Sequence, residues 1–135
     1  EMTGWINYVQ HYDQNQLQAM VNTAKQWRNN NVKKVVLIGI GGSYLGIKAG
    51  MDMLSSQSTR KDFQVYFAHN MNHNYLTNLL NSIGKDKFGI IVISKSGTTL
   101  EPAIAFDLFY NWRHVSAFNL FIDRRERIVH GKQAK

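Results

Sequence analysis

Two loops rich in glycine and hydroxyl residues, each directly after an apolar run, constrain most strongly how this chain can fold. The first loop is 39–43, after the run Val35–Ile38, and the second is 94–99, after the run Ile90–Ile93. A strand that ends in such residues and then opens a helix builds an anion site. Glycine allows close approach of the backbone, and the helix N-terminus adds partial positive charge. Two such loops predict a phosphorylated small-molecule ligand.

The spacing of apolar residues predicts an alternation of helices and strands along the chain. Helices are expected over 14–29, 44–55, 74–83 and 100–112, and strands over 34–38, 64–68, 89–93 and 118–122. Asp13 with Gln16 indicates a capping box, and Gly84 indicates a C-cap. This order favours a three-layer α/β/α fold with a mainly parallel, Rossmann-like sheet. Ligands of such sheets bind at the carboxyl ends of the strands, where both loops lie.

Length and composition limit the possible classes of protein. The 135 residues predict a single domain, and 44% hydrophobic residues argue against disorder. The chain has no cysteine, which excludes disulfides, thiolate metal ligands and a cysteine nucleophile. It contains no run of about 18 apolar residues, so no membrane span is expected.

The net charge of +7 is unevenly distributed. Residues 113–135 hold six Lys or Arg and two acidic residues, so this stretch contributes +4. The favoured interpretation is a solvated basic segment, because no recognition helix or stacking platform accompanies it to support nucleic-acid binding. A modestly positive domain also suits an anionic substrate.

The first loop does not match two common nucleotide-binding motifs. Tyr44 stands where a dinucleotide fingerprint has its third glycine, and Ala68–Asn70 offers no acidic residue for a ribose. Ile47 and Lys48 stand where a P-loop has lysine and a hydroxyl residue. A nucleotide-binding enzyme is therefore disfavoured.

The second loop is the more specific signal, because Ser94, Ser96, Thr98 and Thr99 present four hydroxyls within six residues. A phosphate is bound well by several short donors beside a helix end. Lys95 could neutralise phosphate charge, but it alternates with its serine neighbours, so its side chain is expected to point away from theirs.

The start of the following helix can be placed from its proline. With Thr99 as the N-cap, Pro102 takes the third helical position, where a missing N–H costs no helical bond. Thr98 as the cap would pair with Glu101 in a capping box but would put Pro102 one residue deeper. We therefore favour Thr99, and expect Glu101 to stabilise the helix N-terminus rather than to act on a ligand.

Two histidines have a spacing that a metal site could use. His69 and His73 are four residues apart, but no third ligand lies nearby in the sequence. A structural role is therefore favoured for both, and no metal site is predicted.

Taken together, the two loops resemble the first sugar-isomerase (SIS) domain of the glucose-6-phosphate isomerase family, in its compact bacterial form. The resemblance is carried by the runs Val35–Gly46 and Ile93–Phe106, and it extends from Gly4 to about Phe109. It implies that the chain, 1–135, is a single N-terminal SIS-type phosphosugar-binding domain. The basic segment 110–135 matches the family poorly.

The resemblance also implies a function and a set of site residues. The family interconverts glucose 6-phosphate and fructose 6-phosphate through an enediol, works as a cytoplasmic homodimer, and needs no metal or cofactor. The implied phosphate-binding positions are Ser94, Lys95, Ser96 and Thr99, to which the hydroxyl count adds Thr98. Gly42 and Ser43 are expected to lie against the sugar or phosphate of the hexose 6-phosphate.

The family motifs that carry the catalytic glutamate, a Gly-Gly-Arg segment, a histidine and a lysine are not found in this sequence. Proton abstraction needs a positioned base, so no catalytic residue is assigned here and the chain alone is expected to be inactive. The alternative is a stand-alone SIS-domain regulator that binds a sugar phosphate without catalysis.

Overall fold

The computed structural model describes residues 7, 10–55, 63–112, 115–122 and 127–129. Two units are distinguished, Glu1–Asn31 and Val32–Lys135, and each is described by itself. The first unit contains helix α1 (Gln14–Asn29). Asp13 is its N-cap, and the carboxylate accepts from the backbone N–H of Asn15 at 2.8 Å and of Gln16 at 3.4 Å. Both predicted ends of this helix are confirmed.

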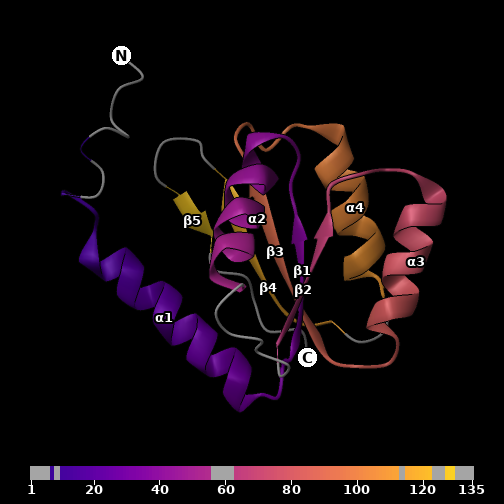
Figure 1. Ribbon diagram of the computed structural model, residues 1–135, viewed down its shortest axis with the longest axis horizontal. Helices are drawn as coiled ribbons and strands as arrows, with labels where there is room; N and C mark the ends of the chain where they lie inside the picture. Colours follow the sequence, from indigo (N-terminus) through magenta and orange to yellow (C-terminus); the bar gives the residue numbers. More distant parts are fainter. Residues whose placement is uncertain (1–6, 8–9, 56–62, 113–114, 123–126, 130–135) are drawn as a thin grey trace. The chain divides into compact units, whose positions relative to one another are not determined.

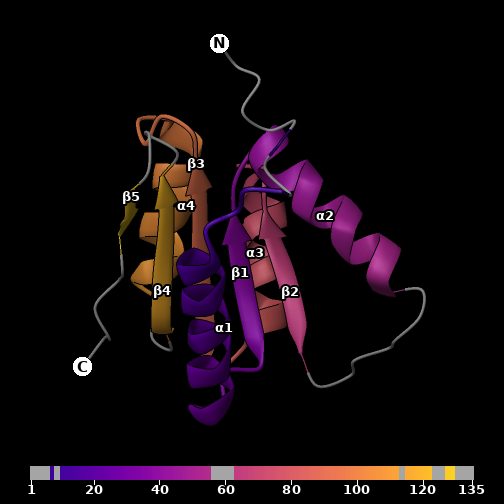
Figure 2. The ribbon, with the colours of Figure 1, turned by 90° about the vertical axis from the view of Figure 1, so that its left-hand side faces the viewer.

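The second unit is built on a five-stranded sheet in the order β2-β1-β3-β4-β5. The strands are β1 (Lys34–Ile38), β2 (Gln64–Ala68), β3 (Phe88–Ser94), β4 (Val115–Ile122) and β5 (Arg127–Val129). The first four pair in parallel and β5 pairs antiparallel to β4 (Figure 2). The mainly parallel sheet is confirmed, although β4 begins earlier than predicted and β5 was not predicted.

Three helices cover this sheet: α2 (Gly42–Ser55), α3 (His73–Ile83) and α4 (Leu100–Tyr110). Helices α3 and α4 lie on one face and α2 lies on the other, as Figure 1 shows. The predicted three-layer α/β/α architecture is therefore confirmed. Helix α2 begins two residues before its predicted start, and α4 ends two residues before its predicted end.

The main core lies between the sheet and helices α3 and α4. Alternate residues of β1, Val36 and Ile38, pack there with apolar side chains of both helices. The residues that alternate with them, Val35 and Leu37, are also buried, as expected for an inner strand covered on both faces. Helix α3 buries four apolar residues: Leu76, Leu79, Leu80 and Ile83.

Helix α3 has the predicted C-terminal residue and a side-chain cap at its start. The Asn72 side chain accepts from the backbone N–H of Tyr75 at 3.2 Å, and Gly84 follows the last turn at φ 64°. A positive φ favours glycine because it has no Cβ. Lys34 of β1 also stabilises this end, since its ammonium donates to the carbonyl oxygens of Ser82 at 2.9 Å and Ile83 at 3.1 Å.

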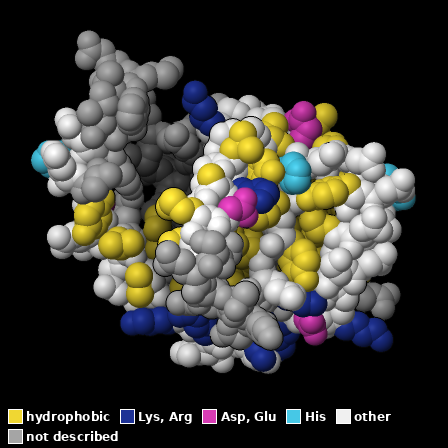
Figure 3. All heavy atoms as spheres, in the orientation of Figure 1, with side chains coloured by type: hydrophobic (Ala, Val, Ile, Leu, Met, Phe, Trp, Pro, Cys, Tyr) yellow, Lys and Arg dark blue, Asp and Glu magenta, His cyan; other side chains and the backbone are white. Residues whose placement is uncertain are grey.

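Helix α2 leaves part of its apolar surface uncovered. Leu45, Met53 and Leu54 are 57%, 73% and 71% exposed, and Figure 3 shows apolar side chains at the surface over this helix. Within the described residues, no helix combines the length and apolar character needed to cross a membrane.

Candidate functional site

The topology brings the two glycine- and hydroxyl-rich loops together. Strands β1 and β3 are parallel neighbours, so the loops that follow them leave the same edge of the sheet. The first loop then opens α2 and the second opens α4. Each loop turns through a glycine with positive φ, Gly41 at 53° and Gly97 at 70°. A side chain at either position would be strained.

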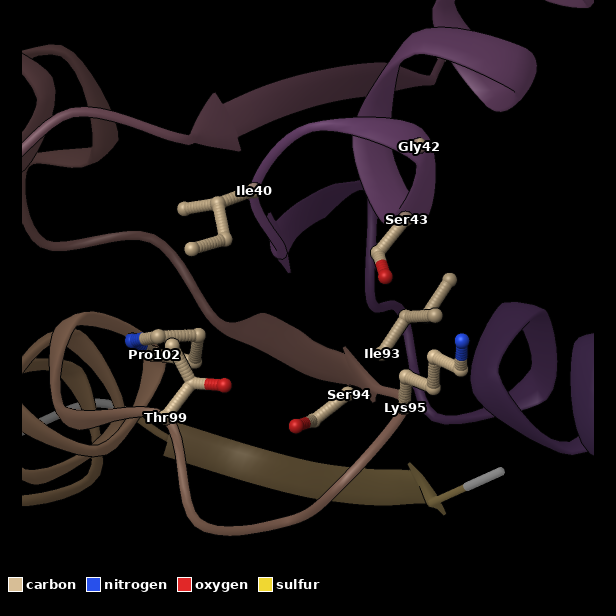
Figure 4. Close-up of a pocket in the computed structure, with 8 residues that line it drawn as sticks. All are labelled: Ile40, Gly42, Ser43, Ile93, Ser94, Lys95, Thr99 and Pro102. Atoms are coloured by element: carbon tan, nitrogen blue, oxygen red, sulfur yellow. The ribbon is translucent and has the colours of Figure 1, made fainter. Parts of the chain in front are cut away.

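A cavity of about 460 Å³ lies between the two loops. Its lining residues come from both loops and from the starts of both helices: Ile40, Gly42, Ser43, Ile93, Ser94, Lys95, Thr99 and Pro102. Figure 4 shows the hydroxyl groups of Ser43, Ser94 and Thr99 pointing toward a common space. Neutral donors from two separate loops therefore converge on one cavity of ligand size.

The structure brings five of the seven predicted site residues to this cavity: Gly42, Ser43, Ser94, Lys95 and Thr99. The other two, Ser96 and Thr98, are not among its lining residues. Both lie in the same loop, where Ser96 is half-buried and Thr98 is exposed.

Hydrogen bonds within the second loop determine which hydroxyl protons remain for a ligand. The Ser96 hydroxyl oxygen accepts from the Thr98 N–H at 3.2 Å and from the Thr98 hydroxyl at 3.0 Å. Both of its lone pairs are then occupied, so its own proton goes to the Thr99 hydroxyl oxygen at 3.3 Å. Thr99 therefore keeps its hydroxyl proton for an acceptor in the cavity.

Ser94 follows the same logic at the end of β3. Its side-chain oxygen accepts from the Gly97 N–H at 3.0 Å, which closes the loop and leaves the hydroxyl proton for another acceptor. Ser94 is only 7% exposed, so a bond to this proton would form away from bulk water. Such a bond to a charged acceptor is stronger than one at the surface.

The starts of the two helices add backbone donors and partial positive charge. Thr99 is the N-cap of α4, as predicted, with φ −70° and ψ 128°, but its side chain makes no capping bond to the helix. The hydroxyl that would serve as a cap instead lines the cavity. Helix α2 begins at Gly42, in the same cavity. Two helix N-termini beside one cavity favour an anionic ligand.

The charged side chains of this region lie at its margin. Lys95 is exposed, and in Figure 4 its side chain leads away from the hydroxyls of Ser94 and Thr99, as its place in the sequence predicted. Glu101 occupies the first turn of α4 and is exposed. The cavity itself is therefore lined by neutral donors, with one cation at its rim.

Close packing at Gly39 holds the first loop against β3. A Cβ at Gly39 would lie 3.2 Å from the Cβ and the carbonyl oxygen of Ser43, and 3.3 Å from the carbonyl oxygen of Ile93. These distances are shorter than ordinary contacts, and two of the three atoms are backbone. A side chain here would force these atoms to shift by a few tenths of an ångström, so glycine favours the close approach that places Ser43 next to the end of β3.

Three lining residues were not predicted: Ile40, Ile93 and Pro102. Each lies close in the sequence to a predicted site residue. Its position in or beside one of the two loops is therefore the signal that could have identified it. Apolar side chains carry no hydrogen-bond donor, so their residue types do not indicate an anion site.

The two histidines considered as metal ligands lie outside this cavity. His69 follows β2 and lines a second cavity, while His73 is the exposed first residue of α3. Within the part of the chain that the structure describes, no group of three or more His, Cys, Asp or Glu residues could hold a metal ion.

The fold and cavity define an α/β domain whose candidate site lies at the carboxyl ends of parallel strands. The family model for phosphoglucose isomerase matches residues 6–117. The chain belongs to this family.

Individual relatives agree with the family assignment. Glucose-6-phosphate isomerase of Streptococcus mutans is 42% identical over 117 residues, covering 81% of this chain and 26% of the relative. The enzyme of the same name from Aster yellows witches'-broom phytoplasma is 45% identical over 106 residues, covering 76% and 24%. A crystal structure of a glucose-6-phosphate isomerase from Chlamydia trachomatis has a TM-score of 0.59 and 31% identity, covering 72% and 20%. The chain thus spans about a quarter of the length of these curated relatives.

Proposed function

We propose that this chain supplies the phosphate-binding domain of a glucose-6-phosphate isomerase, which interconverts glucose 6-phosphate and fructose 6-phosphate. Membership of the phosphoglucose isomerase family supports the reaction. One observation carries the assignment of this chain as the phosphate-binding domain. Hydroxyl groups from both loops and the starts of two helices line the same cavity. In the whole protein we further propose a cytoplasmic homodimer, following the family resemblance.

The proposed roles follow from the hydrogen bonds in the second loop. Ser94 and Thr99 donate their hydroxyl protons to phosphate oxygens, while Ser96, which accepts from Thr98, holds the Thr99 oxygen in place. Lys95 lowers the cost of bringing a dianion to the rim of the cavity. Gly42 and Ser43, at the start of α2, approach the sugar or phosphate from the opposite loop.

No residue of this chain is proposed as the base for isomerisation. Moving a proton between two sugar carbons requires a base within hydrogen-bond reach of those carbons, and the donors described here can only hold the anionic end. We therefore expect no measurable isomerase activity from the purified chain. Turnover of fructose 6-phosphate by the chain alone would contradict this division of roles.

Calorimetric titration with fructose 6-phosphate and, separately, with fructose tests the proposed anchor. The phosphate ester is expected to bind and the free sugar is not. Thr99→Val keeps the side-chain shape but removes a donor to a charged acceptor, which should cost about 1.5–3 kcal/mol of binding free energy. Thr77→Val, on the exposed surface of α3, is the matched control. Equal binding of sugar and sugar phosphate, or no difference between the two variants, would refute the anchor.

A further inference from the structure

We propose that His69 is a positioning residue that fixes the start of α2, and through it Ser43 of the candidate site. The proposal starts from a cluster of rings at the carboxyl end of β2. The rings of His69 and Tyr44 are stacked, with centroids 4.3 Å apart and planes 7° from parallel. Tyr44 belongs to the first turn of α2 and directly follows Ser43. The stack therefore joins the end of one strand to the beginning of a helix that lines the cavity.

The His69 ring is itself held in one orientation. Its Nδ1 lies 3.2 Å from the Phe67 carbonyl oxygen and 3.2 Å from the Tyr75 hydroxyl oxygen. Tyr75 donates its hydroxyl proton to the same carbonyl. A carbonyl can only accept, so the contact with the Phe67 oxygen is a hydrogen bond when Nδ1 carries the hydrogen. The Tyr75 ring also meets the His69 ring edge-on, at 5.2 Å and 73°.

Tyr44 is fixed from a second direction as well. Its ring meets that of Phe67 edge-on at 5.4 Å and 68°. Phe67 belongs to the end of β2, a strand at the edge of the sheet, and His69 directly follows that strand. In contrast, the Tyr44 backbone N–H donates to the Gly41 carbonyl at 3.1 Å, inside the first loop. One residue thus connects the loop at the cavity with a separate cluster of rings.

This arrangement gives Ser43 two supports. Behind it, Ser43 packs close to Gly39, next to the end of β3. Beside it, the Tyr44 ring is clamped by His69 and Phe67. Preorganised donors bind an anion better than donors that must be ordered on binding. Loss of the His69 ring should therefore loosen the first turn of α2 and weaken ligand binding, without removing any group that touches the ligand.

Amide hydrogen exchange on the intact chain tests the structural half of the proposal without any ligand. In His69→Ala, the Tyr44 and Leu45 amides should exchange roughly two- to tenfold faster, the change expected for loss of one aromatic stack. The Ile90 amide, in the buried β3, reports on global unfolding and should change less. His73→Ala, an exposed histidine four residues away, is the control and should leave all three amides unchanged.

Two further variants separate the stack from the hydrogen bond. His69→Phe keeps a ring to stack on Tyr44 but has no donor, whereas His69→Asn keeps a donor near the Nδ1 position but has no ring. Slow exchange is expected to return with phenylalanine and not with asparagine. The opposite order, or wild-type exchange in His69→Ala, would overturn the proposal.

The consequence for binding rests on the proposed function and is measured separately. With fructose 6-phosphate as the probe, the dissociation constant should rise in His69→Ala and fall back in His69→Phe. Faster exchange with unchanged affinity would contradict the link to the site. If the wild-type chain binds no fructose 6-phosphate, the proposed function fails, while the exchange rates still decide whether His69 positions α2.

Discussion

The substitution Gly42→Ala tests whether a ligand approaches the backbone at the start of α2. Gly42 lines the cavity, and a Cβ added to it would meet nothing within 4 Å. Its φ is not in the left-handed region, because the glycines with positive φ among the described residues are Gly41, Gly84 and Gly97. The added methyl group should therefore cost the fold nothing. In a helix, alanine is preferred over glycine by roughly 0.5–1 kcal/mol.

The effect on binding follows from the space that the methyl group fills. A ligand that lies against this backbone would occupy the open space into which the Cβ projects, so the methyl group would hold the ligand away from the amide N–H. Losing one hydrogen bond to a charged group costs about 1.5–3 kcal/mol of binding free energy, which raises the dissociation constant roughly 10- to 150-fold. Gly42→Ala is thus expected to be as stable as the wild type but to bind fructose 6-phosphate at least tenfold more weakly.

Gly46→Ala provides the matched control for this prediction. Gly46 lies in the same helix, its Cβ would also meet nothing within 4 Å, and it does not line the cavity. Urea unfolding and calorimetric titration of both variants give the two quantities needed. If Gly42→Ala binds within twofold of Gly46→Ala, no ligand comes close to this backbone and the role given to the first loop is refuted. Equal loss of binding in both variants would mean that alanine disturbs the helix.

Three further predictions concern the supports of the site and of the core. Gly39→Ala should destabilise the fold by about 1–3 kcal/mol in urea unfolding, because its methyl group would make tight contacts with backbone atoms, among them the Ile93 carbonyl oxygen at 3.3 Å, and force them to shift. Lys34→Met should cost about 1–2 kcal/mol by the same measurement, since it removes a cation from the last carbonyls of α3 but keeps the apolar stem. The hydrogen bond from Lys34 lowers the pKa of Asp86, so this carboxylate stabilises the protein above its ordinary pKa of 3.8 and the benefit is lost as the pH falls through the lowered value. The stability difference between wild type and Asp86→Asn should therefore be present at about pH 6 and disappear in strong acid, and a difference independent of pH would contradict the pairing.

The sequence predicts the sheet and its helices because local signals and tertiary burial agree there. The runs of β1 and β3 are continuously apolar, and the structure buries them on both faces. The fourth strand is a different case, since its start at Val115 was predicted three residues too late and β5 was not predicted. Nothing in a short segment such as Arg127–Val129 marks it as a strand until a partner is available for pairing.

Apolar spacing is less informative about what covers a helix. Helix α2 has a clear set of apolar residues, yet Leu45, Met53 and Leu54 are more than half exposed. Helical periodicity shows that residues share a face, but it does not say whether that face is covered by the same chain. The contact between His69 and Tyr44 also could not be predicted from local spacing. The two residues are 25 positions apart in the sequence, and only the end of β2 brings the two rings together.

In the candidate site, the number of hydroxyl residues does not tell how many of them can donate to a ligand. Four hydroxyls in the second loop predict an anion site, and each looks equivalent in the sequence. The hydrogen bonds distinguish them. Thr98 donates its hydroxyl proton to Ser96 and Ser96 donates its own to Thr99, whereas Thr99 and Ser94 keep theirs. A loop of four hydroxyls thus offers two free donors, and the other two hold the geometry. The sequence can therefore locate such a site. The hydroxyl groups that are available to a ligand are identified only by the directions of the hydrogen bonds within the loop.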